Sequence, residues 1–181
     1  MKKRTIIPLL MTLILFSGCA ETPKAALPFD LDSNGNYTGF GNLPEKYTPG
    51  QAEKDGCYVR VDSKTAGGEQ LWKDFVKAAA EGKDASIRVV NVYGDETYFC
   101  DLFHADGYYR AFDSSSEDLH DKKFKYLLAL KGTLPNAAKS GKVTILTDDK
   151  DLTYDAVMKK FLTSDMRIAE AIPPFELLFT E

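Results

Sequence analysis

The feature that most constrains the fold is a switch to two-residue periodicity near residue 86, interrupted twice by short turns. Residues 86–93, 96–103 and 108–113 are rich in β-branched and aromatic residues, and Gly94-Asp95 and Asp106-Gly107 lie between them. Short connections that contain glycine are typical of hairpins. The three segments are therefore predicted to be consecutive strands of an antiparallel meander.

Segments on both sides of the meander extend it into an α+β fold. Further strands are predicted at residues 57–61, 124–132, 142–147 and 175–179. Apolar residues three or four positions apart predict a helix over 67–81 that ends at Gly82, and a second over 153–162 with Thr153 as N-cap. We expect a mainly antiparallel sheet of about five to six strands with two helices packed on it.

The N-terminus has the features of an export signal. Lys2, Lys3 and Arg4 form a basic segment, and residues 6–16 are almost entirely apolar. Secretory signals combine these two features. The apolar run is too short for a good membrane span, which needs about 20 residues.

The next residues resemble the lipobox, the cleavage motif of bacterial lipoproteins. That motif places an aliphatic residue and two small residues before a cysteine, and here Phe16 stands at the aliphatic position, followed by Ser17, Gly18 and Cys19. The resemblance implies lipid on Cys19 and anchoring at the extracytoplasmic face of the cell membrane. The alternative is an ordinary signal peptide, which would leave Cys19 as a thiol in an oxidising compartment.

These features divide the chain into a signal peptide over residues 1–18, a flexible tether over 19–46 and a single α+β domain over 47–181. The tether is rich in proline and glycine, which favours an extended chain. Four of its apolar residues are nevertheless candidates for docking on the domain: Phe29, Tyr37, Phe40 and Leu43. Loss of the signal's three basic residues takes the net charge from −4 to −7. We therefore expect no nucleic acid partner.

Two cysteines remain if Cys19 carries lipid. Cys57 and Cys100 are then a candidate disulfide, as expected for a leftover pair outside the cytoplasm. The alternative is that they are two separate small side chains in the core, because free cysteine is often buried.

Two acidic segments resemble cation sites without completing one. Residues 30–36 place Asp30, Asp32, Asn34 and Gly35 as in the opening of a calcium loop, but the glutamate that should follow is replaced by Gly41. A polar turn is favoured there. Residues 148–151 hold three aspartates ahead of a predicted helix, where the helix dipole favours acids. We expect neither a metal nor another cofactor.

The sequence contains no catalytic constellation. His104 and His120 are the only histidines, and no serine lies in a nucleophile elbow. An enzyme is therefore not expected. The alternative, a cell-envelope hydrolase or metal-dependent enzyme, requires one of the histidines to meet acidic residues in a cleft.

The third strand of the meander supplies a candidate binding face. Tyr108, Arg110 and Phe112 alternate along it and share one face. If the helices cover the other face, these residues are exposed, and tyrosine and arginine are enriched at interaction hot spots. Packing in the core is the alternative interpretation.

The chain also resembles small lipid-anchored or secreted proteins of Gram-positive bacteria that carry a domain of unknown function. The matching segments are Tyr47-Thr-Pro-Gly-Gln-Ala52, Asp55-Gly-Cys57, Trp72-Lys-Asp-Phe-Val76, Ser86-Ile-Arg-Val-Val90, Asp101-Leu102, Tyr126-Leu-Leu128 and Leu146-Thr-Asp-Asp149. Such proteins are expected to carry Gly-Asp-Pro after the first sheet strand, and Gly94-Asp95-Glu96 stands here. The resemblance implies an extracytoplasmic α+β domain and no activity. With the other features it favours a binding module for a protein partner; a small inhibitor or immunity-like protein is a further alternative.

Overall fold

The segments with two-residue periodicity form three adjacent strands on one side of a five-stranded sheet in the computed structural model, which describes residues 26–44, 47–134 and 140–181. In spatial order the strands are β2 (Lys64–Gly67), β1 (Tyr58–Val61), β3 (Ala85–Tyr93), β4 (Glu96–Ala105) and β5 (Tyr108–Asp113). The predicted meander is confirmed as β3–β4–β5. The pairing is antiparallel throughout except between β1 and β3, which are parallel.

A second, three-stranded antiparallel sheet follows. Its strands, in order, are β6 (Tyr126–Gly132), β7 (Gly141–Thr147) and β8 (Phe175–Thr180). The helices are α1 (Pro49–Lys54), α2 (Glu69–Ala80), α3 (Tyr154–Leu162) and α4 (Met166–Glu170). The α+β class and the mainly antiparallel pairing are confirmed, but the strands are divided between two sheets, and α2 and α3 pack on different ones.

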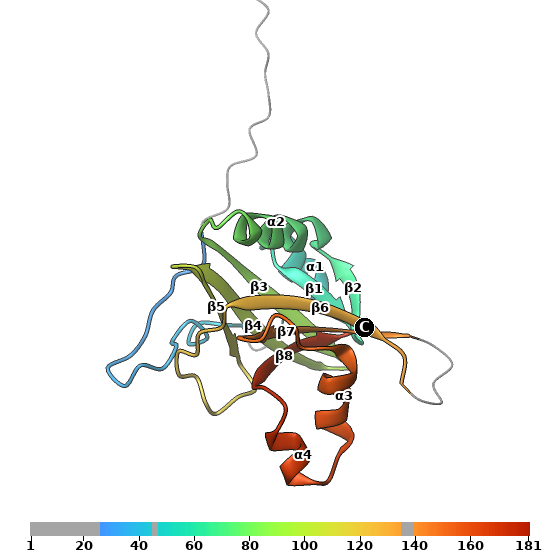
Figure 1. Cartoon of the computed structure of the whole chain (residues 1–181). Coiled ribbons are helices and arrows are strands. Elements are labelled where there is room, and N and C mark those ends of the chain that lie inside the picture. Colours follow the sequence, from blue (N-terminus) through green and yellow to red (C-terminus); the bar gives the residue numbers. More distant parts are fainter. Residues whose placement is uncertain (1–25, 45–46, 135–139) are drawn as a thin grey trace, which may run out of the picture.

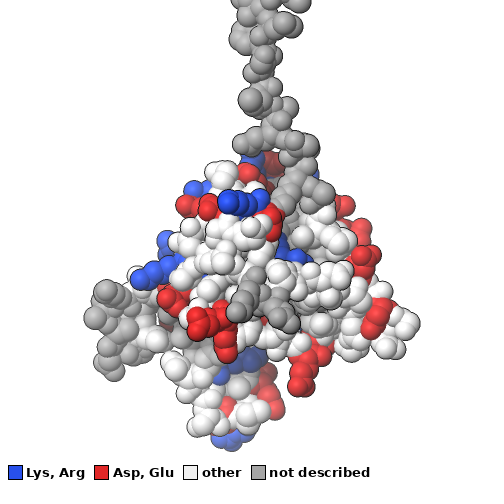
Figure 2. All heavy atoms as spheres, turned by 180° about the vertical axis from the view of Figure 1, so that it is seen from behind, with Lys and Arg blue, Asp and Glu red and all other residues white. Residues whose placement is uncertain are grey.

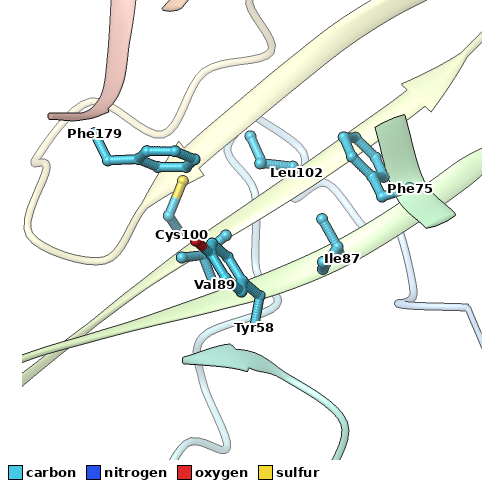
Figure 3. Close-up of a cluster of buried hydrophobic side chains, with 7 residues drawn as sticks. All are labelled: Tyr58, Phe75, Ile87, Val89, Cys100, Leu102 and Phe179. Atoms are coloured by element: carbon cyan, nitrogen blue, oxygen red, sulfur yellow. The ribbon is translucent and has the colours of Figure 1, made fainter. Parts of the chain in front are cut away.

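The main core lies between the five-stranded sheet, α2 and β8 (Figure 1). Alternate residues of β1, β3 and β4 point to this side, and Phe75 from α2 and Phe179 from β8 close over them (Figure 3). The cluster consists of Tyr58, Phe75, Ile87, Val89, Cys100, Leu102 and Phe179. On the outer side of the second sheet, Tyr154 and Val157 of α3 pack against Val143 and Ile145.

β8 is also attached to β1 by a buried arginine. The Arg60 side chain is 1% exposed, and its Nη2 donates to the carbonyl oxygens of Ser63 and Thr180, each at 2.7 Å. Its guanidinium lies over the ring of Phe179, 4.3 Å from the centroid. The C-terminal strand is therefore fixed to an early strand of the chain.

The α2 helix begins later than predicted. Gly67 ends β2, and Gly68 precedes the helix with a left-handed φ of 67°. A side chain at Gly68 would meet the carbonyl oxygen of Cys57 at 2.2 Å, so the chain reverses there on glycine. Thr153 caps α3 as predicted, since its side chain accepts a hydrogen bond from the Ala156 amide.

The first described residues and the last two helices lie at opposite ends of the molecule. Ala26 and Leu27 border a hollow together with Leu71 and Phe75 of α2. In Figure 1 the chain enters the described part beside α2, and α3 and α4 project from the far end. The end of the molecule formed by α3 and α4 is therefore the one far from the point where the described chain begins.

Candidate functional site

The sheet face predicted to bind a partner is covered by the chain itself. Residues 26–43, which we call the N-terminal strap, pack on it together with α1. Tyr37 of the strap stacks on Phe112 with ring centroids 4.3 Å apart, and Arg110 is also buried. The prediction of an open face is therefore wrong for Arg110 and Phe112, which pack in the core as in the alternative interpretation. Tyr108, the third residue of the predicted face, is exposed. Part of the predicted flexible tether is folded, because its aromatic residues bury apolar surface on the sheet.

A buried ionic cluster fastens the strap to the sheet. The Asp101 side chain has no exposed surface, and its oxygens accept hydrogen bonds from Arg88 Nε and Nη2, each at 2.6 Å. The Tyr37 hydroxyl donates a third bond at 2.7 Å, and Arg88 Nη2 also donates to the Gly39 carbonyl at 3.2 Å. Burial and the Asp101 carboxylate raise the pKa of Tyr37. Because all these partners belong to the protein, we interpret this group, the strap clasp, as structural.

Cys57 and Cys100 lie on opposite faces of the five-stranded sheet. Cys100 packs in the main core with Val89, whereas Cys57 packs with Val59 and Val90 beneath α1. Both lie in the described part of the chain, and no disulfide joins them. The disulfide prediction is therefore wrong. Cys57 directly precedes Tyr58, which lies on the same face as Cys100, and neighbouring side chains of an extended chain point to opposite faces of a sheet. Burial raises the pKa of the Cys100 thiol well above its ordinary value.

Cys19 and the rest of the signal lie outside the described residues. Within the described part, no helix is long and apolar enough to cross a membrane. The same part holds no group of three or more histidine, cysteine or acidic side chains arranged to bind a metal.

The acidic segments form turns. Asp32 Oδ1 accepts hydrogen bonds from the Asn34 and Asn36 amides at 2.8 and 2.9 Å, and these contacts lower the pKa of Asp32. Asp148 accepts from the Lys125 amide at 3.0 Å, ahead of α3. The main chain engages these carboxylates, which fits the polar turn favoured for residues 30–36 and the position of Asp148 ahead of a helix.

The two histidines lie apart and in different surroundings. His104 is buried, and its Nδ1 is 2.7 Å from the Lys83 carbonyl oxygen. Because a carbonyl only accepts, Nδ1 carries the proton. His120 is exposed, and its Nδ1 lies 3.0 Å from Asp118. Asp118 also pairs with Lys122, and these contacts lower its pKa to about 2. His104 lines a hollow of about 290 Å³ together with Asp84 and Asp106, but among the described residues neither acid is bonded to it. His120 meets its acid at the exposed surface.

The most exposed apolar side chains gather where α3 turns into α4. Leu162 and Met166 are each 67% exposed and Phe161 is 50% exposed. The other large apolar side chains in the exposed class, all in the described part, reach at most 42%. We call Phe161, Leu162 and Met166 the apolar tip. Exposed apolar groups that gather at one place are typical of interaction sites.

Two hollows lie beside α3, and Leu162 of the apolar tip lines the first of them. One, of about 530 Å³, is lined by Leu134, Met158 and Leu162 among others, and the second, of about 520 Å³, lies between α3 and α4 and is lined by Ile168 and Ile172. Lys159 borders both. In Figure 2, acidic and basic side chains at this end of the molecule are interspersed with uncharged surface. The tip therefore combines an apolar centre with charges of both signs around it.

The sequence predicted the apolar residues of α3 but not their exposure. Tyr154 and Val157 are buried on the second sheet, whereas Phe161 and Leu162, one or two turns later, lie beyond its edge. The Phe161 ring packs edge-on against the ring of Phe175, with the ring centroids 5.6 Å apart. Residues 163–165, which follow the helix, are polar, and this polarity indicates that the chain leaves the core at the end of the helix.

Comparison of the chain with known protein families, curated proteins and solved structures finds no match.

Proposed function

We propose that this chain is a lipid-anchored extracytoplasmic protein that binds a protein partner through the apolar tip. The observation that carries the binding role is the exposure of Phe161 and Leu162 at the end of α3 and of Met166 at the start of α4. Full burial of side chains of this kind is worth roughly 1.5–3 kcal/mol each. Three such side chains are enough for a hot spot, because a few residues usually carry most of the binding energy of an interface.

The anchoring role is supported by the N-terminal sequence. A basic segment, the apolar residues 6–16 and the lipobox-like residues 16–19 stand in the order that a lipoprotein signal requires. The resemblance to lipid-anchored or secreted proteins of Gram-positive bacteria points to the same compartment. Lipid on Cys19 would hold the protein at the membrane surface.

The short distance between Cys19 and the strap supports the orientation of the domain. Residues 19–25 span at most about 25 Å when fully extended. An anchor at Cys19 would therefore hold Ala26 and the α2 end close to the membrane, and the apolar tip would face away from it. This favours a protein partner over the anchoring bilayer as the surface that the tip contacts.

The binding role is tested by cross-linking on intact cells that express the full chain. A photoreactive residue at Ser164 beside the tip should capture one reproducible protein. The double variant Leu162→Glu/Met166→Glu should lose that product. The control variant Ala80→Glu adds a charge to an exposed residue of α2 at the other end of the molecule and should keep it. Equal capture by the double variant would refute the tip as the binding surface.

The anchoring role has a separate test. Cys19→Ala should move the chain from the membrane fraction to the soluble extracytoplasmic fraction, and labelled fatty acid should be incorporated only in the parent chain. Membrane retention of Cys19→Ala without labelling of the parent would overturn the lipoprotein assignment and leave the tip experiment unaffected.

A further inference from the structure

A free edge of β3 is used neither by the strap clasp nor by the apolar tip. β1 pairs with β3 only from Val89 to Val92, so residues 85–88 have β4 on one side and no strand of the described chain on the other. A hollow of about 450 Å³ lies at this edge, and Ser86 and Ile87 are in its lining. We call this edge with its hollow the β3 notch.

The main chain of Ser86 points into the β3 notch. Alternate residues of a strand direct their N–H and C=O groups to the same neighbour. The Val92 carbonyl accepts a hydrogen bond from the Asp62 amide on the β1 side at 3.0 Å, and β3 pairs with β4 without a register shift as far as Ala85. Ser86 stands an even number of positions before Val92, so its N–H and C=O face this side. No described residue bonds to these two groups.

The walls of the β3 notch are apolar and carry negative charge. Leu71 and Phe75 of α2 form one wall, and Asp74 and Asp55 are also in the lining. The Asp55 carboxylate is already engaged, since it accepts hydrogen bonds from Tyr47 and Gln51. Arg88 lies there too, but its guanidinium is bonded within the strap clasp. The Asp74 carboxylate is exposed and accepts a hydrogen bond from the neutral Gln70 amide at 2.8 Å, so its charge favours a cationic group in the notch.

We propose that the β3 notch binds an extended peptide segment of a partner protein, with apolar side chains on both sides of a lysine or arginine. The peptide continues the sheet where β1 leaves it, and its main chain pairs with Ser86. Residues 85–88 offer an edge of about 13 Å, enough for three or four peptide residues. The apolar side chains contact Leu71 and Phe75, and the basic side chain approaches Asp74.

The test is a selection of random heptapeptides on the full chain carrying Cys19→Ala. Enriched peptides are synthesised with a fluorophore, and their dissociation constants are measured by polarisation. Ser86→Pro removes the edge N–H and should weaken binding about tenfold or more, because proline also blocks the pairing. Ser86→Ala is the matched control: both variants lose the hydroxyl that accepts from the Leu27 amide at 2.8 Å, but alanine keeps the N–H.

The expected result is enrichment of basic peptides with flanking apolar residues, weakened by Ser86→Pro and unchanged within about twofold by Ser86→Ala. Asp74→Asn should weaken binding less, by about threefold, with reduced dependence on salt. If Ser86→Pro does not fold, N-methylation of alternate peptide residues must abolish binding to the parent chain. Enrichment of no peptide, or binding that survives both Ser86→Pro and N-methylation, would overturn the proposal. Leu162→Glu/Met166→Glu should leave peptide binding unchanged, which separates this site from the apolar tip.

Discussion

Replacement of Arg88 by methionine tests the strap clasp most directly. The change removes two hydrogen bonds of 2.6 Å to Asp101, whose side chain has no exposed surface, while Arg88 itself is 17% exposed. Among the described residues, the Tyr37 hydroxyl would then be the one remaining hydrogen-bond partner of the carboxylate. A buried charge that loses its partner typically costs about 3–5 kcal/mol. Domains of this size have a total stability of about 5–15 kcal/mol, so much of it would be lost.

The assay is urea unfolding followed by the fluorescence of Trp72, the only tryptophan of the chain. Lys73→Met is the matched control, because the Lys73–Glu69 ion pair has a similar length of 2.8 Å but both side chains are at least 60% exposed. Such exposed pairs contribute less than about 1 kcal/mol. Adding Asp101→Asn to Arg88→Met should restore part of the lost stability, because it removes the buried charge.

A loss for Arg88→Met no larger than that for Lys73→Met would refute this reasoning. So would a further loss when Asp101→Asn is added, since the penalty would then not come from an uncompensated carboxylate. The free energy of unfolding must be compared at equal slope of the urea dependence, so that a change in compactness is not counted as a change in stability.

Three further predictions concern single positions. Ser63 has a φ of 66° in the β1–β2 turn, and Ser63→Gly should raise the free energy of unfolding in urea by about 0.5 kcal/mol, because strain relief exceeds the entropy cost. Gly68→Ala should lower it by more than about 2 kcal/mol, because the added Cβ would lie 2.2 Å from a main-chain oxygen at positive φ. Burial raises the pKa of Glu176 in the folded state. Its charge therefore costs stability above that pKa, and Glu176→Gln should raise the Tm at pH 7 but not at about pH 3.5.

Each of these predictions has a result that contradicts it. A less stable Ser63→Gly would show that the serine side chain compensates for its backbone strain. Gly82 has a φ of 73° but open space around it, so an equal loss for Gly82→Ala would mean that the contact at Gly68 is unimportant. A Tm gain for Glu176→Gln that persists in acid would exclude ionisation as its cause.

The local elements were predictable because their signals are short-range. The turns at Gly94-Asp95 and Asp106-Gly107, the cap at Thr153 and the stop at Gly82 each depend on a few neighbouring residues. β2 was missed because residues 64–67 are mostly exposed and lack apolar alternation. The α4 helix has five residues and no buried side chain, so it gave no core pattern.

The arrangement of the elements depended on contacts that no local pattern encodes. The parallel pairing of β1 and β3 follows from the helix between them, since a strand–helix–strand order favours a crossover. The prediction of a mainly antiparallel sheet assigned no parallel pair, although the helix between residues 57–61 and 86–93 was the signal for one. Asp101 and Arg88 stand directly opposite each other in β4 and β3, and this buried pair was detectable only after the register was known. Tyr37 of the strap, 64 positions before Asp101 in the sequence, then donates a hydrogen bond to the carboxylate of this pair.

The attachment of β8 to β1 means that folding cannot be completed before β8 has been synthesised. Arg60 and Thr180 are 120 positions apart, and Phe179 closes the main core. A nascent chain is synthesised from its N-terminus, so the apolar side of its first sheet stays exposed until β8 has been synthesised. Loss of β8 alone would therefore open the main core, and we expect a chain that ends before it to aggregate although most of its sequence is intact.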